Sequence, residues 1–233
     1  MFLLRRADER GHANHGWLDS HHTFAFADYH DPQWMGFGPL RVINEDRVAA
    51  GGGFAPHRHA NMEIISYVIE GALQHRDSIG NGSVMRPGDV QCMSAGSGIE
   101  HSEFNASQDE PVHFLQVWIQ PDRINAAPTY AQQHYPVAAR RGVLRLVASP
   151  DGAEGSLAIR QDARIYASVL APGETVAHTI DAGRRAWVQV VRGALSLDDG
   201  LVLNAGDAAG VSAQNVLRLR AEADSESLLF DLP

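Results

Sequence analysis

Residues 67–90, YVIEGALQHRDSIGNGSVMRPGDV, have the pattern of a β-strand, a hairpin and a returning strand. Apolar strand residues lead into the tripeptide Gly-Ala-Leu, and a polar turn, a short strand and a Gly-Asp turn follow. The same order recurs in residues 189–207, QVVRGALSLDDGLVLNAGD. A spacing of about 120 residues is too long for the unit of a solenoid. The repeat therefore predicts two copies of one β-domain.

Short runs rich in β-branched and aromatic residues occur in both halves of the chain, bounded by Gly, Pro, Asp and Asn. They are residues 63–71, 112–119, 142–149, 164–173, 186–197 and 227–233. Helical periodicity is scarce, and residues 122–135, interrupted by Pro128, are typical of a linker with one turn. We therefore expect an all-β protein of two tandem antiparallel β-barrel (jelly-roll) domains with few short helices. The expected boundaries are an N-terminal domain over 1–125, a linker over 126–142 and a C-terminal domain over 143–233.

The composition narrows the classes of function. With 44% hydrophobic and 20% charged residues, the chain of 233 residues can build a sizeable core. All 19 basic residues are Arg, which excludes lysine Schiff-base chemistry. The 28 acidic residues outnumber them, which argues against direct binding of nucleic acid.

Other features indicate a cytoplasmic protein. The single Cys92 excludes an intrachain disulfide and fits a reducing compartment. Residues 1–11, MFLLRRADERG, reach charged residues too soon for a secretory signal. No apolar run approaches the roughly 18 residues that a membrane span needs. We therefore expect no membrane partner.

Two pairs of residues with metal-binding side chains stand out. His57 and His59 are two apart, and so are His101 and Glu103, so each pair shares one face of an extended strand. Three imidazoles and one carboxylate on neighbouring strands would suit a borderline divalent metal with open positions. Considered singly, the first pair could be a loop feature and the second a surface ion pair worth less than about 1 kcal/mol.

The second copy serves as an internal comparison. When the two Gly-Ala-Leu tripeptides are aligned, Thr179 and Asp181 take the places of His57 and His59. After residue 207 the chain has neither a histidine nor a His-x-Glu motif. If barrel construction required these histidines, both copies would carry them. The C-terminal domain is therefore expected to lack metal ligands and to be structural.

The spacing from Gly51 to His57 and His59, and then from Gly98 to His101, resembles the two-part cupin signature. The position that usually holds a glutamate in that signature is Ile64, and Glu103 takes over the carboxylate. This relocation resembles the pirin family of the cupin superfamily. Residues 10–46 and the closing LLFDLP are also similar to bacterial pirin-like proteins of the quercetin 2,3-dioxygenase type.

The resemblance implies a bicupin with a metal in its N-terminal barrel, held by His57, His59, His101 and Glu103. It implies a dioxygenase that cleaves a flavonol such as quercetin with O2 and releases CO. The substrate enolate would bind at the open 3-His/1-Glu metal, and Glu103 would accept the hydroxyl proton. The partners would then be a small aromatic substrate and O2. The cofactor would be one divalent transition metal, with Fe(II) favoured and Mn, Co, Ni, Cu or Zn also compatible with the ligands.

Two alternatives are a regulatory or redox-sensing metal protein that acts through a protein partner without flavonol turnover, and a cupin whose metal is only structural. The histidines of the N-terminal segment are not expected to bind a metal. Adjacent His21 and His22 cannot share a strand face, so they are a poor ligand pair. We expect these histidines to cap turns, to be exposed or to contact the metal ligands. His113 is expected to be a satisfied barrel histidine, and His75 either lines the pocket or is one too. The tryptophans are expected in the core; they are Trp17, Trp34, Trp118 and Trp187.

Overall fold

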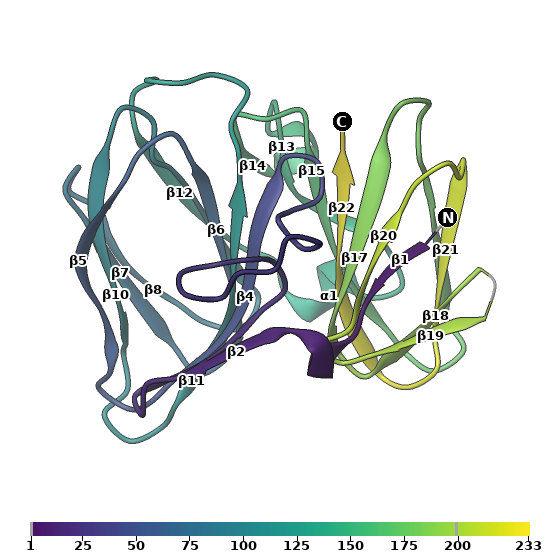
Figure 1. The fold of residues 1–233 in the computed structure, drawn as a ribbon, viewed down its shortest axis with the longest axis horizontal. Helices are drawn as coiled ribbons and strands as arrows, with labels where there is room; N and C mark the ends of the chain where they lie inside the picture. The colour runs from purple at the N-terminus through teal and green to yellow at the C-terminus, as the bar shows by residue number, and fades with distance from the viewer. Residues whose placement is uncertain (1, 199) are drawn as a thin grey trace. The chain divides into compact units, whose positions relative to one another are not determined.

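Strands dominate the chain, as the sequence predicts (Figure 1). The computed structural model describes residues 2–198 and 200–233. Helical segments among them are short: α1 (Val137–Arg140) and the 3-10 turns Ala7–Glu9 and Ala153–Gly155. The chain divides into two compact units. The N-terminal unit comprises residues 11–134 and 157–161, and the C-terminal unit comprises the remaining described residues.

The N-terminal unit contains two antiparallel sheets, one with the order β12-β9-β6-β11-β4-β3-β2 and one with the order β5-β10-β7-β8. The strands are β2 (Gly11–Asn14), β3 (Leu18–His22), β4 (Leu40–Val48), β5 (Gly53–His59), β6 (Glu63–Glu70), β7 (Leu73–Asp77), β8 (Gly82–Met85), β9 (Asp89–Ser94), β10 (Ile99–Asn105), β11 (Val112–Ile119) and β12 (Thr129–His134), and Leu157–Ala158 form the short β14.

The C-terminal unit repeats this plan. One sheet runs β1-β20-β17-β22-β15-β13, and the other runs β16-β21-β18-β19. The strands are β1 (Phe2–Arg5), β13 (Arg145–Ser149), β15 (Arg164–Leu170), β16 (Thr175–Thr179), β17 (Arg185–Arg192), β18 (Ala194–Leu197), β19 (Leu201–Asn204), β20 (Ala208–Val211), β21 (Val216–Ala221) and β22 (Ser225–Leu232). The order β5-β10-β7-β8 thus corresponds to β16-β21-β18-β19, and the predicted duplication is confirmed.

The glycine of each Gly-Ala-Leu tripeptide makes the same turn. Gly71 has φ +76° and Gly193 has φ +72°, which only glycine adopts readily. A Cβ atom on Gly71 would lie 2.5 Å from the Pro111 carbonyl oxygen, and one on Gly193 would lie 2.0 Å from that of Asp224. Both hairpins therefore need glycine for backbone conformation and for space.

The N-terminal core lies between the two sheets. Leu73 and Met85 come from the smaller sheet, Val112 and Phe114 come from the larger one, and all four are fully buried. Burial of such a side chain stabilises the fold by about 1.5–3 kcal/mol. Along β10, however, the buried positions alternate through Ile99, His101, Glu103 and Asn105. The inward face of this strand is thus largely polar, which places chemistry inside the barrel.

Two features differ from the predicted organisation. Residues 129–134 form β12, paired with β9, where a linker with one turn was expected; Pro128 precedes the strand, so its missing N–H removes no ladder bond. The compact units also differ from the predicted domains, because one segment near the N-terminus belongs to the C-terminal unit and one segment of the predicted C-terminal domain belongs to the N-terminal unit. Residues 2–10 join the C-terminal unit because β1 pairs with β20. Residues 157–161 join the N-terminal unit, where the Arg160 backbone N–H donates to Glu63.

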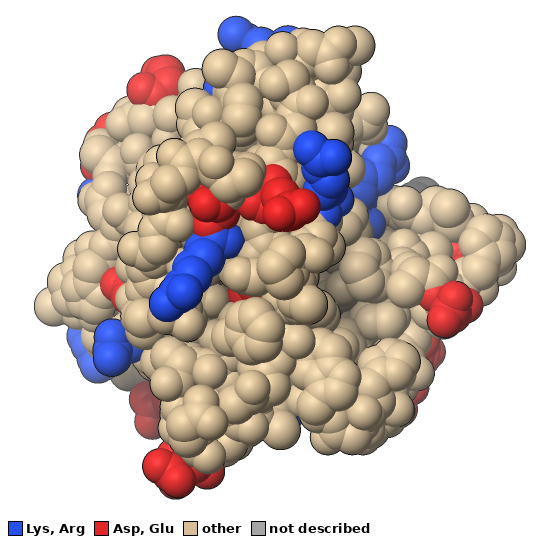
Figure 2. Space-filling view, turned by 90° about the vertical axis from the view of Figure 1, so that its left-hand side faces the viewer, with Lys and Arg blue, Asp and Glu red and all other residues tan. Residues whose placement is uncertain are grey.

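The surface carries both signs of charge. On the described part of the face in Figure 2, acidic and arginine side chains are interspersed with uncharged areas, and no continuous basic area is present. No helix among the described residues is long and apolar enough to cross a membrane.

Candidate metal centre

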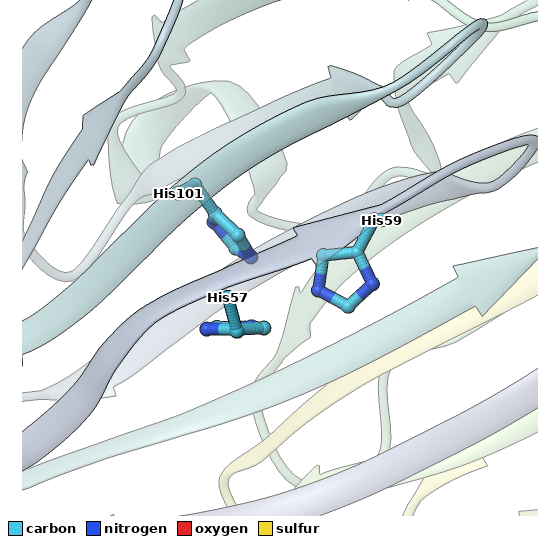
Figure 3. Close-up of side chains that lie close together, drawn as sticks. All are labelled: His57, His59 and His101. Carbon is cyan, nitrogen blue, oxygen red and sulfur yellow. The ribbon is translucent and has the colours of Figure 1, made fainter.

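Three imidazoles gather where β5 pairs with β10 (Figure 3). His101 lies directly opposite His57, and His59 follows two residues further along β5. The ring centroids of His57 and His101 are 4.5 Å apart, and those of His59 and His101 are 4.9 Å apart. One ligand atom from each ring lies within 4.8 Å of the others. Strand pairing therefore assembles the three predicted histidines into one group that can hold a metal.

A β-bulge in β5 lies directly before His57, the first histidine of this group. Ser102 of β10 faces two residues, Ala55 and Pro56, because the register shifts between the His101 and Glu103 pairings. Pro56 has no N–H, so its presence in the bulge costs no ladder bond. The Nδ1–H of His57 donates to the Ala55 carbonyl oxygen at 2.8 Å. This hydrogen bond fixes the tautomer and leaves Nε2 with the lone pair that a metal needs.

The environment of His101 fits a metal ligand. Its side chain is buried, and within the described part of the chain neither ring nitrogen has a hydrogen-bond partner. Burying an unpaired polar group costs about 1–3 kcal/mol, and a bound cation would offset this cost. Burial lowers the pKa of His101 to about 3, and also that of His59 to about 4, with the neighbouring histidines adding to both shifts. Both imidazoles are therefore neutral at pH 7, as metal ligation requires.

Glu103 is placed on the same strand but in a second group. Its carboxylate lies with His75 and His101 in a set whose ligand atoms are within 4.8 Å of one another. Ser66 Oγ donates to Oε1 at 3.1 Å, and Gln116 Nε2 donates to Oε2 at 2.6 Å. Burial raises the pKa of Glu103 to about 7, against the lowering effect of these two hydrogen bonds. The four predicted residues thus fall into two overlapping groups that share His101, and the second group also contains His75.

A pocket of about 890 Å³ opens on this centre, and His57, His59 and Glu103 line it. Aromatic rings form much of its wall, notably Phe54 and Trp118. Trp118 packs edge-on against His59 with ring centroids 4.9 Å apart. Trp17 also lines the pocket and is partly exposed, so the expectation of core positions is wrong for Trp17 and Trp118, whereas it is confirmed for the buried Trp34 and Trp187.

The sequence contains a signal for Trp118. Gln116 and Trp118 are two apart on β11, so they share a face, and both line the pocket. A glutamine in the middle of an apolar strand indicates that its face of the strand does not pack in the hydrophobic core, and Trp118 is on that same face.

A polar wall on β3 and β4 completes the pocket. His22 Nε2 donates to Ser20 Oγ at 2.9 Å, and Ser20 Oγ donates to Asp46 Oδ1 at 2.5 Å. Burial raises the pKa of Asp46 to about 7, with a further contribution from the charge of Glu45. The pocket therefore holds two carboxyl groups, Asp46 and Glu103, that can exchange protons near neutral pH.

The other strand histidines have partners. His113 Nε2 donates to Glu45 Oε1 at 2.9 Å, which confirms its expected role as a satisfied barrel histidine. His75 is fully buried, donates to Asp77 Oδ2 at 3.1 Å and stacks on Tyr130. Its ring centroid is 5.4 Å from that of His101, so it packs behind the centre.

Comparison with known proteins shows which family the chain belongs to. Residues 4–119 match the family model described as Pirin, and residues 146–232 match the Quercetinase C-terminal cupin domain. The chain is 46% identical over 233 residues to a quercetin 2,3-dioxygenase of Escherichia coli strain K12, covering 100% of this chain and 99% of that protein. The chain belongs to the pirin family. A pirin-like protein of Caulobacter vibrioides is 41% identical over 226 residues, 96% of each chain.

Solved pirin structures have the same fold. The crystal structure of the bacterial pirin YhhW from Escherichia coli in complex with nickel(II) superposes with a TM-score of 0.95. It is 47% identical, and the match covers 100% of this chain and 99% of that one. The bicupin architecture implied by the resemblance is thereby confirmed.

The second copy of this pirin has apolar residues at the centre. Counting back from the paired residues Leu73/Asn105 in the first copy and Leu195/Ala221 in the second makes Leu217 the equivalent of His101, and Leu219 the equivalent of Glu103. Both leucines are fully buried. Leu217 faces His178, which is therefore the pairing equivalent of His57. The alignment on Thr179 is one residue off because the segment from His178 to Gly193 is one residue longer than the segment from His57 to Gly71.

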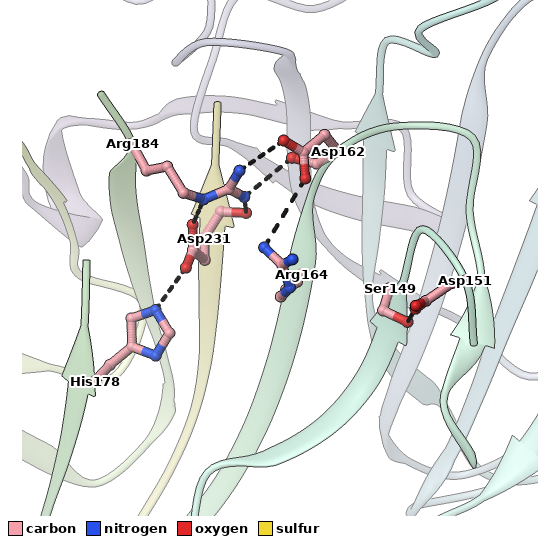
Figure 4. A network of polar contacts seen from close by, with 7 residues as sticks. All are labelled: Ser149, Asp151, Asp162, Arg164, His178, Arg184 and Asp231. Atoms are coloured by element: carbon pink, nitrogen blue, oxygen red, sulfur yellow. Dashed lines mark hydrogen bonds and ion pairs between the residues drawn. The ribbon is translucent and has the colours of Figure 1, made fainter. Parts of the chain in front are cut away.

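His178 is engaged in an ion-pair network (Figure 4). Its Nε2 donates to Asp231 Oδ2 at 2.7 Å, and Arg184 binds the other oxygen of the same carboxylate. Arg184 also donates to Asp162 Oδ2 at 2.8 Å. His178 at this place in the second copy thus bonds to a carboxylate.

Proposed function

We propose that this pirin is a metal-dependent dioxygenase that cleaves a flavonol such as quercetin with O2 and releases CO. The observation that carries the proposal is the aromatic pocket, whose lining includes two histidines of the cluster and the protonatable Glu103. A pocket of about 890 Å³ is in the range of sites that take a drug-sized ligand. The names of full-length relatives support the same activity.

We assign the metal to His57, His59, His101 and Glu103. The donor set of three imidazoles and one carboxylate accepts borderline divalent ions, and Fe(II) is the ion we favour. The nickel(II) bound by the related YhhW pirin is compatible with the same donors. When bound, the metal would orient the 3-hydroxyl of the flavonol and lower its pKa.

Glu103 is the proton acceptor in this proposal. A carboxylate beside the metal lies within reach of the 3-hydroxyl. In the metal-free protein burial raises the pKa of Glu103 to about 7. Gln116 and Ser66 hold the carboxylate in one orientation through the hydrogen bonds described above. The side chains of Phe54 and Trp118 would stack on the planar substrate and exclude water. Both atoms of O2 enter the depside product when the ring opens and CO leaves.

Oxygen uptake and CO release with quercetin test the proposal. We expect turnover by the metal-loaded wild type and a loss of about 10²–10⁴-fold in Glu103→Gln and His101→Ala. His134→Ala is the matched control, because His134 is an exposed histidine on β12 that pairs with Asp89, and it should leave turnover unchanged. A fully metal-loaded wild type that consumes no O2 would instead favour a regulatory metal protein that acts through a partner. That partner and the cytoplasmic location stay predictions.

A further inference from the structure

A second group of potential metal ligands lies on the hairpin of β2 and β3. His12 of β2 is directly opposite His21 of β3, and Asp19 lies two residues before His21. Because side chains alternate along a strand, these three share one face of the hairpin. Ser20 and His22, on the other face of β3, line the pocket, and His12 also reaches its wall.

The arrangement repeats the geometry of the first centre. There, His101 lies opposite His57, and the third ligand, His59, is two residues along the same strand as His57. Here, His12 lies opposite His21, and Asp19 is two residues along the strand of His21. Two neighbouring strands therefore present three donors in the same pattern at both places.

The three side chains are already close together. His12 Nε2 donates to Asp19 Oδ1 at 2.6 Å. The rings of His12 and His21 stack with centroids 4.5 Å apart and an interplanar angle of 20°. One ligand atom from each residue lies within 4.8 Å of the other two. Little side-chain freedom remains to be lost on binding, which lowers the entropic cost.

We propose that His12, Asp19 and His21 form a second metal site, which takes a borderline divalent ion such as Zn²⁺ or Ni²⁺. Two imidazoles and a carboxylate are donors that such ions prefer. The ion takes the place of the Nε2 proton of His12, the ring changes through solvent to the tautomer protonated at Nδ1, and the ring of His21 joins the same coordination sphere.

The surroundings determine the strength of this site. The side chains of His12 and Asp19 are 52% and 40% exposed, so water completes the coordination sphere. On β4, Glu45 lies opposite His21 and Arg47 lies opposite Asp19, and these two form an ion pair at 3.2 Å that largely cancels their charges. An exposed site with three donors binds more weakly than a buried one. We therefore expect the second ion to bind with lower affinity than the ion at His101.

Equilibrium dialysis of the full, chelator-treated chain against Zn²⁺ tests the proposal independently of dioxygenase activity. Wild type should bind two ions, and His21→Ala and His12→Ala should each bind one, at the higher affinity. His101→Ala should also bind one ion, at the lower affinity, and the double variant His21→Ala/His101→Ala none. His30→Ala, an exposed histidine of the same N-terminal segment, is the control and should still bind two.

Three results would overturn the second site: one ion per wild-type chain, two ions retained in His21→Ala, or an equal loss in His30→Ala. If His101→Ala does not fold, His59→Ala takes its place, because His59 is only partly buried. Paramagnetic broadening of the His12 and His21 imidazole NMR signals by Ni²⁺ is the second measurement. It should persist in the variant that lacks the first centre, and its absence there also overturns the proposal.

Discussion

His101 lies opposite His57 across the β10–β5 pair, with ring centroids 4.5 Å apart, whereas the corresponding pair in the second copy is Leu217 opposite His178. The same two strands therefore tolerate an imidazole or a leucine at one buried position. The polar residue is not required to form the barrel. Its retention in only one copy points to chemistry, because an unpartnered buried imidazole destabilises the fold.

The substitution His101→Leu tests this separation of fold from function. We expect the metal-free variant to be as stable as the wild type or more stable, by about 1–3 kcal/mol, because leucine needs no hydrogen bond. Metal binding at the first centre should be lost. Thermal unfolding in the presence of a chelator, with metal analysis of the reloaded protein, measures both effects. A strongly destabilised metal-free variant would show that the imidazole supports the barrel itself.

Much of the centre could be predicted from the sequence because strand geometry is periodic. Residues two apart share a face, so His57 with His59 and His101 with Glu103 were correctly paired within their strands. The contact between the two pairs depends on which strands are neighbours, and the sequence supplied that only through the family resemblance. The assignment of all four as ligands of one metal stays a prediction.

The missed features depend on register and on tertiary neighbours. One extra residue between His178 and Gly193, relative to the segment from His57 to Gly71, moves the equivalence between copies to His178. An insertion of this kind outside the paired strands leaves no periodic signal. His12 lies opposite His21 only because of the register in which β2 pairs with β3. The spacing of residues along one strand does not predict the register between two strands. Pro128 favours a linker over residues 122–135, and only the pairing with β9 makes residues 129–134 a strand.

The stability of the metal-free protein should depend on pH through Glu103. Burial raises its pKa from 4.5 to about 7, so folding favours the protonated form. The stabilisation is complete below the unfolded-state pKa and is lost as the pH rises through about 7. Relative to Glu103→Gln, the wild type should therefore lose roughly 3 kcal/mol between pH 4 and pH 8.

Urea unfolding of both proteins in chelator at several pH values measures that difference. The comparison isolates Glu103, because His59 and His101 titrate in both proteins. Their lowered pKa values act in the opposite direction, with stability lost as the pH falls below 6.5. A difference between wild type and Glu103→Gln that does not change with pH would contradict the raised pKa.

Trp118 should determine how tightly the pocket holds an aromatic substrate. The substitution Trp118→Ala removes the ring that packs against His59 and widens the pocket. We expect kcat/KM for quercetin to fall about 10-fold or more, mainly through KM, with metal content unchanged. Trp118→Phe keeps an aromatic face and should retain most of the activity. An equal loss in both variants would mean that the indole acts through something other than stacking.

The C-terminal unit should be sensitive to loss of Asp231. This carboxylate is nearly buried, and it binds both His178 and Arg184. Burial alone would raise its pKa, but the hydrogen bonds and charges of these two residues lower the pKa below the usual value. Its contribution to stability is therefore present above the unfolded-state pKa of 3.8 and is lost as the pH falls through the lower folded-state value.

We expect Asp231→Asn to cost about 3–5 kcal/mol at pH 7, because it leaves the guanidinium of Arg184 without its buried counter-charge. Asp162→Asn removes the more exposed partner of the same guanidinium and should cost less than about 1 kcal/mol. Chemical denaturation at pH 7 compares the two. Similar small losses in both variants would mean that solvent compensates for the charge of Arg184, and that the network contributes little to the second copy. A large loss in Asp231→Asn alone would show that this buried carboxylate stabilises the second barrel as the counter-charge of Arg184.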